Sequence, residues 1–136
     1  MYKIMKAKIN MLGIMTSQLE VMRDFYRDVM GFKIMLEMEG GYVEFENEGV
    51  RFALSTHKVM AEATGHPSYN EPRKGQSLEL AFVVDSPALV DETYNSLVQK
   101  GATPIKSPED LPWQQRAAFF ADPDGNIHEI FADIPK

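Results

Sequence analysis

The chain has 136 residues, 44% of them hydrophobic and 25% charged, and no cysteine, which predicts one globular domain and excludes disulfides, thiolate catalysis and thiolate metal ligands. A net charge of -6 without clustered Lys and Arg argues against nucleic-acid binding and makes a cation the expected charged small ligand. No apolar run reaches the ~20 residues of a membrane span, and residues 1–8 lack the pattern of a secretion signal, so we expect a cytoplasmic protein without membrane contact.

The first half of the chain predicts a β-α-β-β-β module at about residues 5–56. A short buried strand at residues 9–15 precedes a helix that Ser17 caps and Gly31 ends. Turn signals rich in Gly and Asn then separate three short β-like segments. These expected strands span residues 32–37, 42–46 and 50–55.

Residues 57–76 show no clear periodicity, contain two Gly and two Pro, and are long for a connection inside a compact domain. We predict that this segment is a linker or a lid over a bound molecule. His57 lies just past a strand and His66 lies within the segment, so both imidazoles are expected to be exposed.

The second half predicts another such module at about residues 77–133. Ser86 caps a helix that has Pro87 at its first position, and Gly101 ends that helix. A tight turn, Asp122-Pro-Asp-Gly-Asn126, joins the two strands of a final hairpin. The expected strands span residues 78–84, 102–106, 117–121 and 127–131, and residues 108–115 are expected to be irregular.

The predicted fold class is therefore α+β, with two β-α-β-β-β modules in a single domain of residues 1–136. Each module would cover one face of its sheet with a helix, which leaves the opposite curved faces to line a shared groove. Function is expected in that groove.

Two glutamates are the candidate catalytic residues. Strand alternation places Glu129 on the face turned away from the helix, and it places His128 on the helix side. Glu79 is expected on the same open face as Glu129. Mutual repulsion and partial burial would raise at least one of their pKa values and give a general acid or base. The alternative is that both are solvated side chains on a half-exposed sheet.

Several motifs, taken in order along the chain, resemble the glyoxalase, bleomycin-resistance and dioxygenase superfamily, also called the vicinal oxygen chelate fold. The matching segments are Leu19–Phe32 with Phe25-Tyr26 and Met30-Gly31-Phe32, Glu79–Asp85, Trp113-Gln-Gln-Arg116, and Asp122-Pro-Asp-Gly-Asn126 followed by Glu129. The resemblance covers essentially the whole chain and implies the fold described above. Members include metal-dependent isomerases, ring-cleaving dioxygenases, thiol transferases and proteins that sequester drugs.

The resemblance also implies where a metal would bind, and this chain departs from that pattern. Met11 stands where the first His is expected, Ala53 or a neighbour takes the second ligand position, and Glu79 replaces the second His. Of the ligand positions that the resemblance implies, only that of Glu129 is occupied by the expected kind of residue. Two carboxylates suit a loosely held Mg²⁺ or Mn²⁺ better than Zn²⁺, Ni²⁺ or Fe²⁺. We therefore expect no cofactor, with a weakly bound divalent ion as the alternative.

Four further residues complete the predicted ligand site. Trp113 corresponds to an aromatic residue beside the groove of the drug-binding members, and Phe119 shares the strand face of Glu129. Both could stack on a flat or cationic molecule, although Phe119 could equally fill the core. Met11 could line the groove, and Arg51 could anchor an anionic group at its rim or pair with a surface acid.

The leading hypothesis is a small-molecule-binding protein of the bleomycin-resistance type, which confers antibiotic resistance by sequestering an aromatic or cationic compound. One alternative is a lyase, isomerase or thiol transferase that uses Glu79 or Glu129 as its base, with a weakly bound metal. Another is a ligand-sensing accessory protein whose partner is a protein. The resemblance implies a homodimer, and the sequence leaves open the ligand and whether the groove lies within one chain.

Overall fold

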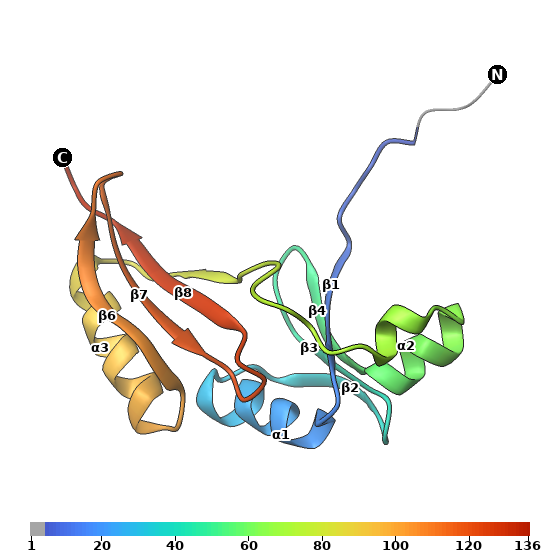
Figure 1. The fold of residues 1–136 in the computed structure, drawn as a ribbon. Coiled ribbons are helices and arrows are strands. Elements are labelled where there is room, and N and C mark those ends of the chain that lie inside the picture. Colours follow the sequence, from blue (N-terminus) through green and yellow to red (C-terminus); the bar gives the residue numbers. More distant parts are fainter. Residues whose placement is uncertain (1–4) are drawn as a thin grey trace. The chain divides into compact units, whose positions relative to one another are not determined.

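A computed structural model describes residues 5–136, which form two four-stranded sheets and three α-helices (Figure 1). The N-terminal residues 1–4, on which the absence of a secretion signal partly rests, lie outside the described part. Contacts divide the chain into two compact units, the first made of residues 1–19 and 32–71 and the second of residues 20–31 and 72–136. The fold class is α+β, as predicted.

The first unit contains a mixed sheet with the strand order β1-β4-β3-β2. Its strands are β1 (Met11–Thr16), β2 (Ile34–Met38), β3 (Tyr42–Phe45) and β4 (Arg51–Thr56). The pair β1 and β4 is parallel, and the other pairs are antiparallel. Alternation along β3 and β4 buries one face of this sheet, where Phe45 and Phe52 stack with ring centroids 5.5 Å apart. The predicted strands are confirmed, with ends shifted by at most two residues.

The segment 57–76, in which the sequence shows no clear periodicity, contains regular structure. Helix α2 (His57–Thr64) begins directly after β4, and a 3-10 turn follows at Pro67–Asn70. Thr56 caps α2 by accepting a hydrogen bond from the Val59 N–H, and Gly65 ends it with a left-handed φ of 67°. These caps stabilise a helix that was not predicted, because no clear periodicity was found in this segment.

The second unit contains the strand order β5-β8-β7-β6, with helix α3 packed along one face (Figure 1). Its elements are β5 (Ala81–Val83), α3 (Pro87–Gln99), β6 (Thr103–Leu111), β7 (Gln115–Ala121) and β8 (Ile127–Asp133). Ser86 caps α3 as predicted, by accepting the Leu89 N–H. Strand β6 continues through the first half of the region predicted to be irregular, because bulges let it keep pairing with β7 despite two prolines.

The helix predicted between residues 17 and 31 begins at Leu19. Helix α1 (Leu19–Asp24) runs into a π-helical turn, Phe25–Val29, and Gly31 follows with a φ of 85°. From Glu20 to Gly31 this segment belongs to the second unit, where Phe25 and Tyr26 are buried. The described chain has no helix long and apolar enough to cross a membrane.

Candidate functional site

The open face of the second sheet carries the predicted carboxylate pair. Glu129 on β8 pairs in register with Ala81 on β5 and Phe119 on β7, and its side chain is half-buried. Glu79 lies two residues before β5 and is exposed. Burial and the negative charge of Glu79 raise the pKa of Glu129, so the two carboxylates interact. Glu129 can therefore hold a proton at a higher pH than an ordinary glutamate.

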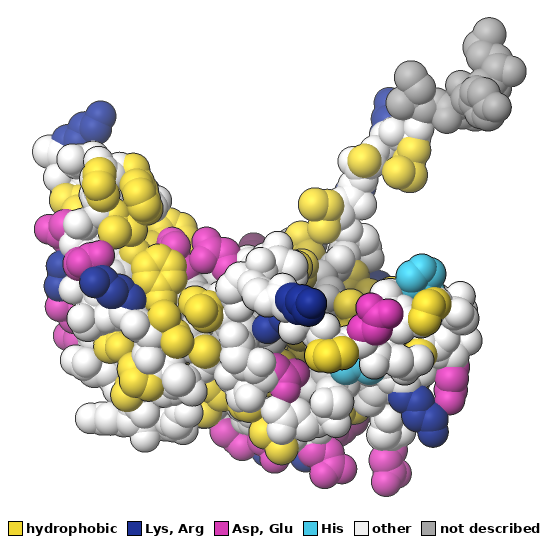
Figure 2. Space-filling view, viewed as in Figure 1, with side chains coloured by type: hydrophobic (Ala, Val, Ile, Leu, Met, Phe, Trp, Pro, Cys, Tyr) yellow, Lys and Arg dark blue, Asp and Glu magenta, His cyan; other side chains and the backbone are white. Residues whose placement is uncertain are grey.

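Hydrophobic side chains surround Glu129 on this face. Phe119 and Phe131 are both half-exposed on neighbouring positions of β7 and β8, and Val83 on β5 is 71% exposed. Figure 2 shows hydrophobic side chains gathered over the strands of this unit, on the side of the sheet opposite α3. The face combines aromatic surface with one half-buried carboxylate, which suits a flat organic cation.

Trp113 lies away from this carboxylate. It is 63% exposed in the turn between β6 and β7, where its indole N–H donates to Oε1 of Gln115 over 3.0 Å. Six residues separate Trp113 from Phe119, which corresponds to roughly 20 Å along an extended strand. Within this unit the structure brings Glu79, Phe119 and Glu129 together and leaves Trp113 at the far end of the hairpin.

Directly behind Glu129, His128 faces the helix side and is fully buried, as strand alternation predicted. The Leu80 N–H donates to its Nδ1 over 3.2 Å, so the proton of the neutral ring is on Nε2. That Nε2–H donates to the Tyr26 hydroxyl over 2.8 Å, and the hydroxyl donates to Oδ2 of Asp122 over 2.6 Å. Burial and the Asp122 charge raise the pKa of Tyr26 far above its usual range, so the phenol stays protonated.

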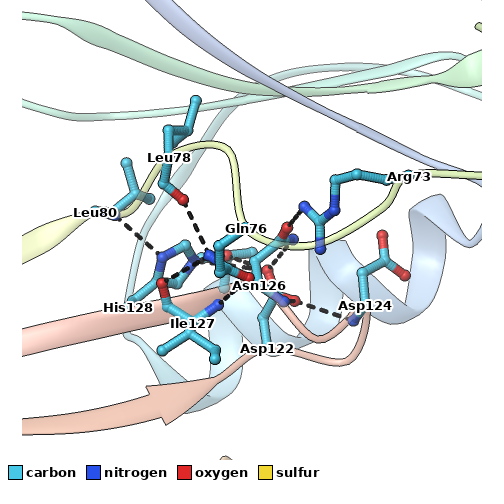
Figure 3. A network of polar contacts seen from close by, with 10 residues as sticks. Arg73, Gln76, Leu78, Leu80, Asp122, Asp124, Asn126, Ile127 and His128 are labelled. Carbon is cyan, nitrogen blue, oxygen red and sulfur yellow. Dashed lines mark hydrogen bonds and ion pairs between the residues drawn. The ribbon is translucent and has the colours of Figure 1, made fainter. Parts of the chain in front are cut away.

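Side chains also fix the segment that precedes β5 (Figure 3). The Gln76 side chain behaves like an added strand residue, because its Oε1 accepts the Ile127 N–H over 3.3 Å and its Nε2 donates to the Ile127 and Leu78 carbonyls. Arg73 donates to Oδ1 of Asn126. These bonds and the one to His128 hold the residues on either side of Glu79 against β8.

The open face of the first sheet carries a polar cluster that sequence reasoning only partly found. Arg51, a predicted ligand residue, donates to both carboxylate oxygens of Glu44, at 2.6 and 3.1 Å. Tyr42 donates to Oε1 of Glu44 over 2.7 Å and contacts Sδ of Met11 at 3.4 Å. Met11 and Arg51 therefore do lie on one face, but Arg51 is paired with an acid. The alternation of Tyr42 and Glu44 along β3 was the signal that could have identified both.

We predict an acid-dependent stability contribution from this cluster. Hydrogen bonds from Arg51 and Tyr42 lower the pKa of Glu44 to about 2 from an ordinary value of 4.5. A carboxylate with a depressed pKa stabilises the folded state fully above about pH 4.5, and this contribution disappears as the pH falls toward about 2. Arg51→Met should therefore lower the melting temperature by several degrees at pH 7 and by much less at pH 2.5.

Thermal unfolding followed by circular dichroism across this pH range measures the effect. Lys33→Met is the matched control, because Lys33 is exposed and near no such carboxylate, and it should change the melting temperature little at either pH. An equal loss for Arg51→Met at both pH values would contradict the assigned ion pair.

The residues at the superfamily's metal positions do not fit a transition metal. Met11 and Ala53 supply no hard ligand, and residues 5–136 contain no group of three or more His, Cys, Asp or Glu side chains that could hold an ion. The additional acid on the first sheet, Glu44, is already paired with Arg51. We therefore derive no chemical step through a metal.

The comparisons with known proteins agree with this fold. The sequence profile of the Glyoxalase/Bleomycin resistance protein/Dioxygenase superfamily matches residues 8–130. The chain belongs to this superfamily. A solved glyoxalase/bleomycin resistance protein/dioxygenase from Nocardioides superposes with a TM-score of 0.86 and 30% identity, covering 97% of this chain and 87% of that chain. The lactoylglutathione lyase of Agrobacterium tumefaciens, at 24% identity, shows the fold alone, with a TM-score of 0.71 and 93% of each chain covered.

Of two curated relatives, one is uncharacterized and the other is named as a dioxygenase. The uncharacterized protein YraH of Bacillus subtilis is 32% identical over 127 residues, which cover 91% of this chain and 97% of YraH. Biphenyl-2,3-diol 1,2-dioxygenase 2 of Rhodococcus globerulus is 29% identical over 127 residues, covering 88% of this chain. This chain matches 60% of the length of that dioxygenase. Superfamily membership therefore leaves the activity to be argued from the residues of the site.

Proposed function

We propose that this superfamily member binds a flat, cationic organic molecule on the open face of its second sheet and sequesters it without chemical change. The observation that carries the proposal is Glu129, a half-buried carboxylate on a hydrophobic sheet face, with Glu79 close enough to raise its pKa. A bound cation would attract both carboxylates and offset part of their mutual repulsion. Binding energy then comes from charge pairing at the centre of an apolar surface.

The aromatic residues support the same ligand. Phe119 and Phe131 present half-exposed rings on neighbouring strands beside Glu129, and a planar cation gains both stacking and cation–π attraction from such faces. Val83 adds exposed aliphatic surface on β5. A ligand without charge would gain the apolar contacts but not the ion pairing.

Further features of the proposal come from the superfamily. Drug sequestration would give antibiotic resistance, and a cytoplasmic homodimer is the assembly that we propose. Trp113, Met11 and Arg51 would then serve ligand binding only if the ligand extends beyond the Glu129 surface. The segment 57–76 would act as a lid, and reduced hydrogen exchange there on ligand binding would support that role.

Three acridines of the same shape test the proposal. We expect the cation 10-methylacridinium to bind at least tenfold more tightly than neutral acridine at pH 8, and acridine-9-carboxylate to bind weakest. Glu129→Gln should weaken 10-methylacridinium binding about tenfold and leave acridine within about twofold, because only the cation uses the charge. Glu92→Gln, an exposed glutamate on α3, is the matched control and should change neither affinity.

The pH dependence gives a second readout. Only the ionised form of Glu129 attracts the cation, so affinity for 10-methylacridinium should fall as the pH decreases through the raised pKa of this residue. The fall should begin at a higher pH than an ordinary glutamate pKa of 4.5 would give. Titration by fluorescence anisotropy measures it. Equal affinity for the cation and the neutral ring at all pH values would overturn the proposal.

The raised pKa of Glu129 also favours one alternative, an enzyme in which this carboxylate acts as a general base. A lyase or isomerase of this kind would turn over the hemithioacetal of methylglyoxal, and Glu129→Gln would abolish the rate. The assay should be run with and without added Ni²⁺, Zn²⁺ or Mn²⁺. A rate no higher than the uncatalysed background under all conditions would exclude this alternative.

A further inference from the structure

A pocket lies within the first unit, at the edge of its sheet. It has a volume of about 600 Å³, which is within the range of small-molecule sites. Its walls come from the ends of β1 and β4, the β2–β3 turn, helix α2 and the 3-10 turn. The lining residues are Thr16, Ser17, Gly40, Thr56, His57, Lys58, Ala61, Glu62 and Asn70.

The position of this pocket follows from the topology of the sheet. Strands β1 and β4 are parallel neighbours, and Thr16 and Thr56 are register partners at their carboxyl ends. Side chains and loops beyond the carboxyl ends of parallel strands commonly form ligand sites, because the chain leaves both strands at the same edge. This site differs from the open sheet face that carries Tyr42, Glu44 and Arg51.

The two threonines present hydroxyl protons at this edge. Oγ1 of Thr16 accepts the Gln18 N–H over 3.0 Å, and Oγ1 of Thr56 accepts the Val59 N–H over 3.1 Å. A hydroxyl that accepts such a bond can still donate its own proton. Thr16 is fully buried, whereas Thr56 is half-exposed, so a ligand atom in the pocket can accept the Thr56 proton.

His57 points more directly to a ligand. We predicted an exposed imidazole, but His57 is half-buried, and its Nδ1 is buried without a hydrogen-bond partner in residues 5–136. A buried ring nitrogen without a partner carries a desolvation cost. A polar group of a molecule bound in this pocket would supply the missing partner.

Two opposite charges define the class of molecule. Lys58 and Glu62 are one turn apart on α2, both line the pocket, and neither belongs to an ion pair within the described chain. Lys58 lies in the first turn, where the helix dipole also favours negative charge, and Glu62 lies toward the other end. A free anion would be repelled by Glu62 and a free cation by Lys58, whereas a molecule with both charges satisfies both.

We propose that this pocket binds a small zwitterion with a carboxylate and an ammonium group, as in an amino acid. The carboxylate is bound by Lys58 and the Thr56 hydroxyl, and the ammonium group is bound by Glu62. This site is independent of the Glu129 surface, so it can be tested whether or not an aromatic cation binds there.

Titrations of the full chain followed by nuclear magnetic resonance test the proposal. The zwitterionic probes are 4-aminobutanoate and glycine. Acetate carries the carboxylate alone, and methylammonium carries the ammonium group alone. We expect the zwitterions to shift the amide signals of residues 56–62 and the imidazole signals of His57. Acetate and methylammonium should bind at least about tenfold more weakly, because each meets one repelling charge.

Lys58→Gln and Glu62→Gln should each weaken 4-aminobutanoate binding about tenfold, and Lys74→Gln, an exposed lysine of the second unit, should not. Both test positions are exposed, so the amide spectrum will show that the variants remain folded. Acetate binding as tightly as 4-aminobutanoate would overturn the zwitterion assignment. The absence of shifts at residues 56–62 with every probe would overturn the site.

Discussion

Asp122→Ala is expected to lower the free energy of unfolding by about 3–5 kcal/mol, the largest effect on stability that we predict. Asp122 is 1% exposed and accepts four hydrogen bonds in the described structure. They come from the Tyr26 hydroxyl, the backbone N–H groups of Asp124 and Asn126, and the Asn126 side-chain amide. Alanine would leave these donors without an acceptor in a buried place. Urea denaturation at pH 7 measures the loss.

Three further variants separate the contribution of this network from the general effects of substitution. Asp122→Asn keeps one acceptor oxygen and should lose less than Asp122→Ala, and Asp85→Ala removes an exposed aspartate from the same unit and should change stability by about 0.5 kcal/mol or less. Tyr26→Phe should cost about 1–3 kcal/mol, because it removes one donor and leaves the others in place. A loss below about 1 kcal/mol for Asp122→Ala would show that the turn does not depend on this carboxylate.

Asp122 also makes the folding stability depend on pH, with less stability in acid. Burial alone would raise the pKa of Asp122, but the nearby His128 ring and the hydrogen bonds from Tyr26 and Asn126 outweigh burial and lower it below the ordinary 3.8. The stabilisation is therefore complete above about pH 3.8 and is lost as the pH falls through the depressed pKa. Asp122→Asn should remove this part of the pH dependence.

Strand alternation was enough to predict the orientation of the residues on β8. It placed Glu129 on the open face and His128 on the helix side, since side chains on a strand alternate whatever the rest of the molecule does. Glu79 was expected on the same open face, and the structure brings it near Glu129 through the parallel pairing of β5 with β8. Strand alternation therefore predicts side-chain orientation correctly where the orientation depends on one strand alone.

Other parts of the site depend on contacts that no local pattern encodes. The sequence did not reveal that Arg51 pairs with Glu44, because the two side chains meet across neighbouring strands whose register was unknown. Helix α2 escaped prediction because its stability depends on the Thr56 and Gly65 caps more than on a hydrophobic stripe. The same helix carries His57, which the structure half-buries at the pocket of the first unit.

Glu129→Lys is expected to reverse the charge preference of the second sheet, with at least about a 100-fold loss of 10-methylacridinium affinity and a gain for acridine-9-carboxylate. Two unit charges 4 Å apart interact by about 4 kcal/mol at the effective dielectric of a protein surface, so replacing attraction with repulsion exceeds the 2.7 kcal/mol that 100-fold requires. Because Glu129 is only half-buried, a lysine can extend its ammonium group to solvent and the fold should survive. The new charge would also pair with Glu79.

Fluorescence anisotropy with the three acridines measures this reversal, and Glu92→Lys on α3 is the matched control, since it makes the same change in net charge away from the sheet face. The control should shift each affinity by less than about threefold. The contrary outcome is that Glu129→Lys lowers the affinities for the cation, the neutral ring and the anion by the same factor. The substitution would then be changing the shape of the binding surface and not its charge. The carboxylate of Glu129 would then not be the group that recognises the ligand.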